Sequence, residues 1–182
     1  MTIITTFPIL TTERLILRQL DVLDEQEIFF LRSDERVNKY LVAQIAQSVE
    51  EARAFINKIN AGIINNEWGY WGITFKNDNK LIGTICFWNF SKEENKAEIG
   101  YVLHPDLQGK GIMQEAIQKV IDYGFEKMKL RSIEAVLNPD NARSISLLKR
   151  NGFIFQKKEE DGAVVYVLVN PGLQNKMVFN KR

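Results

Sequence analysis

The feature that most constrains this chain is an uninterrupted strand, glycine turn and helix in residues 98–125. Over residues 98–103, Ile, Tyr and Leu alternate with other residues, which predicts a strand whose two faces meet different surroundings. His104-Pro105-Asp106 ends this strand, because proline cannot donate to a ladder and aspartate favours turns. Two glycines follow, and from Ile112 onwards apolar residues recur at the spacing of one helix face. The sequence therefore predicts a helix that begins directly after a glycine turn.

A turn of this kind can hold an anion. The first amides of a helix lack an internal partner and carry the positive end of the macrodipole, and glycines let a ligand approach the backbone closely. We therefore expect a phosphate or pyrophosphate at Gly109 and Gly111. Two familiar phosphate motifs do not fit, because the dinucleotide fingerprint needs a third glycine where Gln114 stands and a P-loop needs a different glycine spacing.

Length and composition narrow the range of functions. At 182 residues the chain fits one domain, residues 1–182. The 24 basic and 23 acidic residues leave a net charge of +1, so we expect neither a nucleic-acid partner nor a membrane partner. Cys86 is the only cysteine, so we expect no disulfide framework and no metal. The chain has no signal-peptide start and no apolar run of membrane length, and we expect a cytoplasmic protein.

The other segments predict further strands and helices. Alternating patterns predict strands at 14–18, 68–75, 81–90 and 131–137, with a closing hairpin at 153–156 and 163–169. The turn Asn77-Asp78-Asn79 is expected to join the strands at 68–75 and 81–90 as a hairpin. Helical spacing and capping residues predict helices near 28–31, after Ser48 and after Asn141, and Ser48 with Glu51 is expected to form a capping box. The strands at 98–103 and 131–137 flank one helix, which favours parallel pairing with a right-handed crossover.

Two segments resemble motifs of the GNAT superfamily of N-acetyltransferases. Gln108-Gly109-Lys110-Gly111-Ile112-Met113 resembles the family's Gln/Arg-x-x-Gly-x-Gly/Ala segment, except that Met113 stands where the family has Gly or Ala. Residues 141–153 resemble the block Asn-x-x-Ser/Ala-x-x-Leu-x-x-Lys/Arg-x-Gly-Phe. The opening Thr12-Glu13-Arg14-Leu15 is similar to the start of the RimJ/RimL branch of the family.

The resemblance implies a fold, a reaction and a co-substrate. The fold is α/β, with a mixed, mostly antiparallel sheet of six to seven strands, a splayed parallel pair at its centre and about four helices on both faces. The reaction is transfer of an acetyl group from acetyl-coenzyme A (acetyl-CoA) to a primary amine, by direct attack in a ternary complex. We expect the N-terminal α-amino group of a ribosomal or other protein as the acceptor, in a monomer or a homodimer. A small amine (polyamine, amino acid or antibiotic) and a CoA-binding module without turnover stay open as alternatives.

The resemblance also assigns roles to residues. It implies that the backbone amides from Gln108 to Met113 bind the pyrophosphate, and that Lys110 and Arg143 meet the 3′-phosphate. The expected cofactor-binding residues are Tyr101, Val102, Leu103, Gln108, Gly109, Lys110, Gly111, Ile112, Met113, Asn138, Asn141, Arg143 and Ser144.

Two side chains are expected to move protons. An ammonium has no lone pair, so the acceptor must lose a proton, and Glu98 is the candidate base, directly or through a water. The departing thiolate also needs a proton, and Ser144 is the candidate donor because Leu148 stands where many relatives carry a tyrosine. A free amide of Val102 or Leu103 would stabilise the thioester oxygen. A surface ion pair for Glu98, and a backbone hydrogen bond for the Ser144 hydroxyl, stay open as alternatives.

Overall fold

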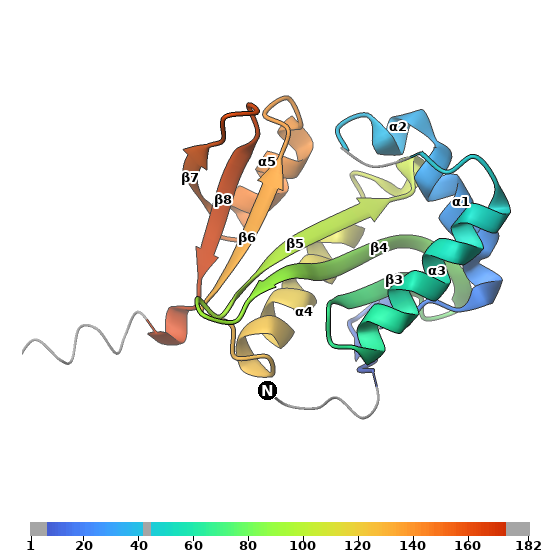
Figure 1. Ribbon diagram of the computed structural model, residues 1–182, viewed down its shortest axis with the longest axis horizontal. Helices are drawn as coiled ribbons and strands as arrows, with labels where there is room; N and C mark the ends of the chain where they lie inside the picture. Colours follow the sequence, from blue (N-terminus) through green and yellow to red (C-terminus); the bar gives the residue numbers. More distant parts are fainter. Residues whose placement is uncertain (1–6, 42–44, 174–182) are drawn as a thin grey trace, which may run out of the picture.

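The computed structural model describes residues 7–41 and 45–173. Its strands form one eight-stranded sheet in the order β1-β2-β3-β4-β5-β6-β8-β7 (Figure 1). The strands are β1 (Leu10–Thr11), β2 (Leu15–Arg18), β3 (Gly69–Phe75), β4 (Asp78–Ser91), β5 (Lys96–Leu103), β6 (Ser132–Leu137), β7 (Ile154–Lys158) and β8 (Val164–Val169). The helices are α1 (Glu25–Ser33), α2 (Glu35–Asn38), α3 (Val49–Ile64), α4 (Ile112–Glu126) and α5 (Ala142–Arg150), with short 3-10 helices at Val22–Asp24 and Pro105–Leu107.

This sheet confirms the expected fold class. Every neighbouring pair is antiparallel except β5 and β6, which run parallel around the α4 crossover. The described residues contain one strand more than the six to seven expected, because the two-residue β1 extends the edge beside β2. Helices cover both faces, as expected, and α4 and α5 lie on the opposite face from α1 and α3.

The side chains of β5 point alternately to the two faces of the sheet, so this strand packs into the apolar core on each face. Ala97, Ile99 and Leu103 are buried in the core cluster beneath α4. Val102 instead packs against the cluster formed by α1 and α3 on the other face. The two surroundings inferred from the alternating pattern are therefore two separate apolar cores, one on each side of the sheet.

The parallel pair separates along its length. β5 and β6 are in register at Lys96 with Ser132, Ala97 with Ile133 and Glu98 with Glu134, and no pairing follows. Both strands nevertheless continue, β5 in register with β4 as far as Leu103 and β6 in register with β8 as far as Leu137. Figure 1 shows the two strands diverging on the side where α2 and α5 lie. The expected splay is thus present, and it begins directly after Glu98.

Two local details differ from expectation. The β3–β4 turn is Lys76-Asn77 rather than Asn77 to Asn79, because Asp78 already pairs with Phe75. Ser48 caps α3 by accepting from the Glu51 amide at 3.3 Å, as predicted. The Glu51 carboxylate, however, accepts from the amide of Gln47 at 2.9 Å, one residue earlier than in a capping box. None of the helices in the described ranges is long and apolar enough to cross a membrane.

A reciprocal amide pair joins the two helices on either side of the splay. Gln114 Nε2 in α4 donates to Asn151 Oδ1 at 2.7 Å, and Asn151 Nδ2 donates back to Gln114 Oε1 at 3.1 Å. Asn151 also donates to the Leu147 carbonyl at 2.8 Å at the end of α5. This pair fixes the start of α4 against the end of α5.

We predict that Gln114→Ala lowers the free energy of unfolding by about 1 to 2 kcal/mol, because both interhelical hydrogen bonds are lost and the partly buried Asn151 Oδ1 is left without its donor. Gln118→Ala is the matched control, because Gln118 is exposed on the same helix and bonds only to Asp122 nearby at 3.2 Å. Its effect should stay within about 0.5 kcal/mol. Urea unfolding of both variants measures the difference, and equal midpoints would contradict the bridging role.

Candidate active site

A large cavity of about 1120 Å³ opens where β5 and β6 separate. Its walls come from α2, the end of β5, the glycine turn and the start of α5. Four cationic side chains and a single acidic one stand among its described lining residues: Arg36, Lys39, Arg143 and Arg150, against Asp140. The electrostatic balance of the lining therefore favours an anionic ligand.

The glycine turn has a backbone that other residues adopt poorly. Gly109 has φ +77° and Gly111 has φ +75°, both in the left-handed region that favours glycine. Gly111 is the N-cap of α4 and supplies no capping side chain. The first bond of the helix runs from the Glu115 amide to the Gly111 carbonyl at 3.1 Å, so the amides of Ile112, Met113 and Gln114 have no helical acceptor. These three residues line the cavity.

One amide of the expected pyrophosphate set is already engaged. The Gln108 amide donates to the Pro105 carbonyl at 3.2 Å, which closes the 3-10 helix before the turn. The Gln108 side chain instead bridges two walls of the cavity, donating to the Leu103 carbonyl at 3.3 Å and accepting from Arg143 at 3.0 Å. Gln108 therefore shapes the cavity through its side chain.

Most of the expected cofactor-binding residues line this one cavity. Its walls contain Tyr101, Val102, Leu103, Gln108, Gly109, Gly111, Ile112, Met113, Asn141, Arg143 and Ser144. Lys110 and Asn138 are not among the lining residues. The Asn138 side chain accepts from the Asp140 amide at 2.9 Å, and its carbonyl accepts from the Asn141 amide at 3.0 Å, so it shapes the turn before α5.

The sequence did not predict a role for Arg14, whose side chain hydrogen-bonds to the glycine turn and to the first turn of α4. Its Nε donates to Glu115 Oε2 at 2.6 Å and its Nη1 to the Lys110 carbonyl at 3.2 Å. Thr12 also hydrogen-bonds the Glu115 carboxylate. The β2 end of the sheet is thereby tied to the turn and to the first turn of α4. The only sequence signal was the resemblance of the opening residues to one branch of the family, which assigned no role to Arg14.

Strand alternation decides which β5 amides face the gap. The His104 amide donates to the Ile82 carbonyl in β4 at 2.8 Å. Because hydrogen-bonding direction alternates along an antiparallel strand, the Val102 amide also points toward β4, where Val102 pairs with Thr84. The amides of Tyr101 and Leu103 then point toward the open side. The amide of Val102 or of Leu103 was expected to stabilise the thioester oxygen. Of these two amides, only that of Leu103 points toward the gap between β5 and β6.

The hydroxyl groups of Ser144 in α5 and Tyr101 in β5 form a hydrogen bond across the gap between the diverging strands. Their hydroxyl oxygens lie 2.6 Å apart, and the Ser144 amide is capped by Asn141 Oδ1 at 3.2 Å. The Ser144 hydroxyl thus pairs with a side chain of β5, whereas a backbone partner was the alternative. Burial raises the pKa of Tyr101 to about 12, although the hydrogen bond with Ser144 acts in the opposite direction. Tyr101 therefore carries its proton at neutral pH.

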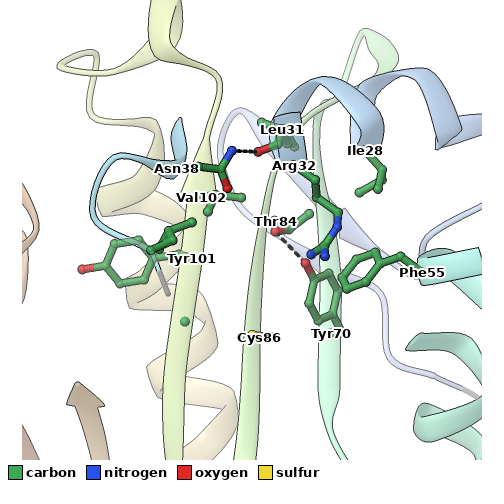
Figure 2. Close-up of a pocket in the computed structure, with 12 residues that line it drawn as sticks. Ile28, Leu31, Arg32, Asn38, Phe55, Tyr70, Thr84, Cys86, Tyr101 and Val102 are labelled. Atoms are coloured by element: carbon green, nitrogen blue, oxygen red, sulfur yellow. Dashed lines mark hydrogen bonds between the residues drawn. The ribbon is translucent and has the colours of Figure 1, made fainter. Parts of the chain in front are cut away.

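A second, smaller pocket of about 150 Å³ lies on the face covered by α1 and α3 (Figure 2). Its described lining is Ile28, Leu31, Arg32, Asn38, Leu41, Phe55, Tyr70, Thr84, Cys86, Gly100, Tyr101 and Val102. Leu41, Tyr101 and Val102 also line the larger cavity. The two spaces therefore meet at the unpaired end of β5.

Glu98 lies at the last paired position of β5 and lines neither space. It is half-buried on the same strand face as Gly100, and Asn89 Nδ2 donates to it at 3.4 Å. Burial raises the pKa of Glu98 above its usual value; the Asn89 hydrogen bond opposes this rise and the nearby Glu134 carboxylate adds to it. Lys96, two residues earlier on the same strand, forms ion pairs with Glu94 and Glu134.

The sheet with its splayed parallel pair and a cavity at the opening can be compared with known families of enzymes. The family model described as "Acetyltransferase (GNAT) domain" matches residues 14–154. The chain therefore belongs to the GNAT acetyltransferase family and is an acyltransferase.

Relatives and solved structures agree with this assignment. The chain is 38% identical over 147 residues to the "Uncharacterized N-acetyltransferase YoaA" of Bacillus subtilis, covering 81% of this chain and 83% of that protein. It is 33% identical over 115 residues to the "Ribosomal-protein-serine acetyltransferase" of Escherichia coli, covering 62% of each. The crystal structure of spermidine N-acetyltransferase from Vibrio cholerae, in complex with CoA and spermine, superposes with a TM-score of 0.76 at 21% identity, over 86% of this chain and 95% of that one. Acceptors thus differ among similar proteins.

We predict that Gly111→Asp abolishes binding of coenzyme A, because it strains a left-handed turn and adds a negative charge where the free amides converge. Gly111→Ala is the matched control: a Cβ there meets only Arg14 Nη2 at 3.6 Å, so it adds strain without charge or a clash. The strain of about 1 to 2 kcal/mol is present with and without the ligand, so it should lower the free energy of unfolding and leave the affinity for coenzyme A close to that of the wild type. Isothermal titration measures both variants, and an Asp variant with wild-type affinity would contradict the assignment of the turn.

Proposed function

We propose that this enzyme transfers an acetyl group from acetyl-CoA to the α-amino group at the N-terminus of a protein. The observation that carries the proposal is the meeting of a large cavity with a cationic lining and a small, mostly apolar pocket at Tyr101 and Val102. A thioester held in the first space and an amine held in the second would face each other at the open edge of β5.

The larger cavity fits coenzyme A. The free amides of Ile112, Met113 and Gln114 would bind the pyrophosphate at the positive end of α4. Arg143, held by Gln108, would meet a phosphate as a charge-assisted donor. Lys110 is exposed beside the turn and would add a longer-range attraction. The co-substrate supplies an activated acetyl group, and the chain supplies its orientation.

The chemistry of the amine favours an N-terminus. Removing a proton at pH 7 costs about 1.36 kcal/mol for each pKa unit above 7, which is roughly 1 to 1.4 kcal/mol for an α-amino group but about 4.6 for a lysine. The small pocket supports the same choice. A cavity of 150 Å³ admits a group about the size of benzene, whereas drug-sized ligands need about 300 Å³ or more. One terminal residue fits this space better than an aminoglycoside does.

The charge of the pocket argues against a polyamine. Spermidine and its relatives carry several positive charges, and their recognition calls for carboxylates. Within the described ranges, Arg32 is the one charged residue that lines the small pocket, and it is cationic. The described lining of this pocket therefore offers no carboxylate to a polycation.

The proposal gives each proton a path. Glu98 takes the proton of the acceptor amine through water along the strand face it shares with Gly100. Ser144 donates its proton to the departing thiolate and takes one from Tyr101, its hydrogen-bond partner at 2.6 Å. Tyr101 then regains a proton from solvent in the larger cavity, which it lines. The Leu103 amide, directed toward the gap, stabilises the negative charge on the thioester oxygen.

An acceptor screen tests the proposed function. Release of free thiol from acetyl-CoA is measured with N-terminal peptides, N-acetylated forms of the same peptides, spermidine and an aminoglycoside. We expect turnover with unblocked peptides and at least tenfold lower kcat/KM with the polyamine and the antibiotic. Turnover of blocked peptides through lysine alone, or a preference for spermidine, would overturn the proposal.

We predict that Glu98→Gln lowers kcat by about 10²-fold or more while the KM for acetyl-CoA stays unchanged. Because the pKa of Glu98 is raised, wild-type kcat should fall as pH drops through a value above 4.5, the usual value for this side chain, and the variant should lack this acidic limb. Glu94→Gln, on the exposed β4–β5 turn, is the control and should behave as wild type. A Glu98→Gln variant with unchanged kcat across pH would exclude Glu98 as the base.

A further inference from the structure

Trp88, near the end of β4, has an indole N–H group without an acceptor among the described residues. The other two tryptophans of the chain donate to backbone carbonyls, Trp68 to that of Ile59 at 2.8 Å and Trp71 to that of Pro8 at 2.9 Å. Trp88 is also 46% exposed to solvent. A ligand can therefore reach both its ring and its donor.

The indole nitrogen of Trp88 lies next to Gly100 at the edge of the small pocket. A Cβ at Gly100 would lie 3.7 Å from Trp88 Nε1 and 3.3 Å from Cys86 Sγ. Gly100 and Cys86 line the pocket, and Figure 2 shows Cys86 at the end away from Leu31. Trp88 follows Cys86 by two residues in β4, so both side chains point to the same face of the sheet. The donor thus borders the pocket where β5 has no side chain.

The same donor lies close to the proposed base. Trp88 and Glu98 are directly opposite each other in the antiparallel β4–β5 pair, where the Cβ atoms of opposed residues are about 5 Å apart. Glu98, Gly100 and Val102 follow one another on one face of β5. A group held over Gly100 therefore lies between the base and the end of β5 where the two spaces meet.

The N-terminus of a peptide matches this arrangement. Its amine and its first carbonyl are attached to the same Cα atom, so a site can contact both at once. An indole N–H group can only donate, which suits a carbonyl oxygen and not an amine that must keep its lone pair for attack. The amine of a lysine side chain or of a polyamine has no carbonyl on the adjacent carbon.

We propose that Trp88 Nε1 donates a hydrogen bond to the first peptide carbonyl of the acceptor, while the first side chain enters the small pocket. This inference rests on the proposed function and adds the peptide carbonyl to what the site recognises. The acceptor chain then leaves over Gly100 toward the turn that joins β4 to β5. Figure 1 shows α1 and α3 beside β3, away from this turn. Trp88 determines specificity and takes no part in proton transfer.

Pairs of acceptors that differ in one bond test the proposal on the full chain with acetyl-CoA. One member is a peptide that begins with alanine, serine or methionine. In the other member a trans carbon–carbon double bond replaces the first peptide bond, which keeps the shape but removes the carbonyl. Trp88→Phe keeps an aromatic ring and loses the N–H donor. We expect this variant to lower kcat/KM for the peptide about three- to tenfold, chiefly through KM, and to leave that of the alkene close to the wild-type value.

Two further variants bracket this result. Gly100→Ala adds a methyl group beside the indole N–H and should raise KM for the peptide. Its affinity for acetyl-CoA should stay unchanged, because Gly100 is not among the lining residues of the larger cavity. Trp68→Phe is the matched control: it loses an N–H that bonds within the fold, so it should lower the melting temperature and leave the ratio of peptide to alkene unchanged.

The outcomes separate the two proposals. Equal losses for peptide and alkene in Trp88→Phe, or no loss for either, would overturn the role of Trp88 alone. Isothermal titration of the coenzyme A-loaded chain with the same pairs gives the comparison without turnover. Equal Kd values for peptide and alkene in the wild type would overturn that role whether or not the variants fold. Peptide binding that depends on Trp88, without release of thiol from acetyl-CoA, would support the role of Trp88 and overturn the proposed function. Absence of binding by every pair would overturn both.

Discussion

The separation of β5 from β6 after Glu98 is the constraint on which the site depends. Each strand keeps its outer neighbour, β4 for β5 and β8 for β6, so backbone groups on the inner edges have no ladder partner beyond this point. Buried amides and carbonyls need partners. The helices that follow the two strands, α4 and α5, both begin at this open end; the first amides of α4 have no side-chain cap, whereas Asn141 Oδ1 caps the Ser144 amide of α5. A ligand with phosphates and amide groups suits this opening.

The sheet also divides the two halves of the site. The larger cavity involves the turn before α4 and the start of α5, and the smaller pocket is closed by α1, α2 and α3. β5 contributes to both because its successive side chains point to opposite faces. Tyr101 and Val102, neighbours in sequence at the unpaired end of β5, are among the lining residues of both spaces. One strand can in this way bring a donor and an acceptor together without a mobile domain.

Much of the fold could be predicted because its signals are local. Alternation, capping residues and punctuating glycines predicted the main strands and helices, and the single crossover predicted the parallel pair. Two local predictions were wrong because neighbouring residues can form the same kind of structure. The β3–β4 turn begins at Lys76 rather than at Asn77, and the Glu51 carboxylate accepts from the amide of Gln47 instead of that of Ser48. Glu98 is on the expected strand, but only its pairing register shows that it lies before the splay and outside both spaces.

The sequence by itself determined the strand, the glycine turn and the helix whose first amides are free, because left-handed φ values and unpaired helix amides are properties of a short segment. Only the tertiary structure decided which distant side chains meet. The Tyr101–Ser144 pair, the Gln114–Asn151 bridge and the support of the turn by Arg14 join residues far apart in the chain. The place of Arg32 beside Phe55 in the smaller pocket likewise depends on how α1 and α3 pack on the sheet, and packing between elements has no local sequence pattern.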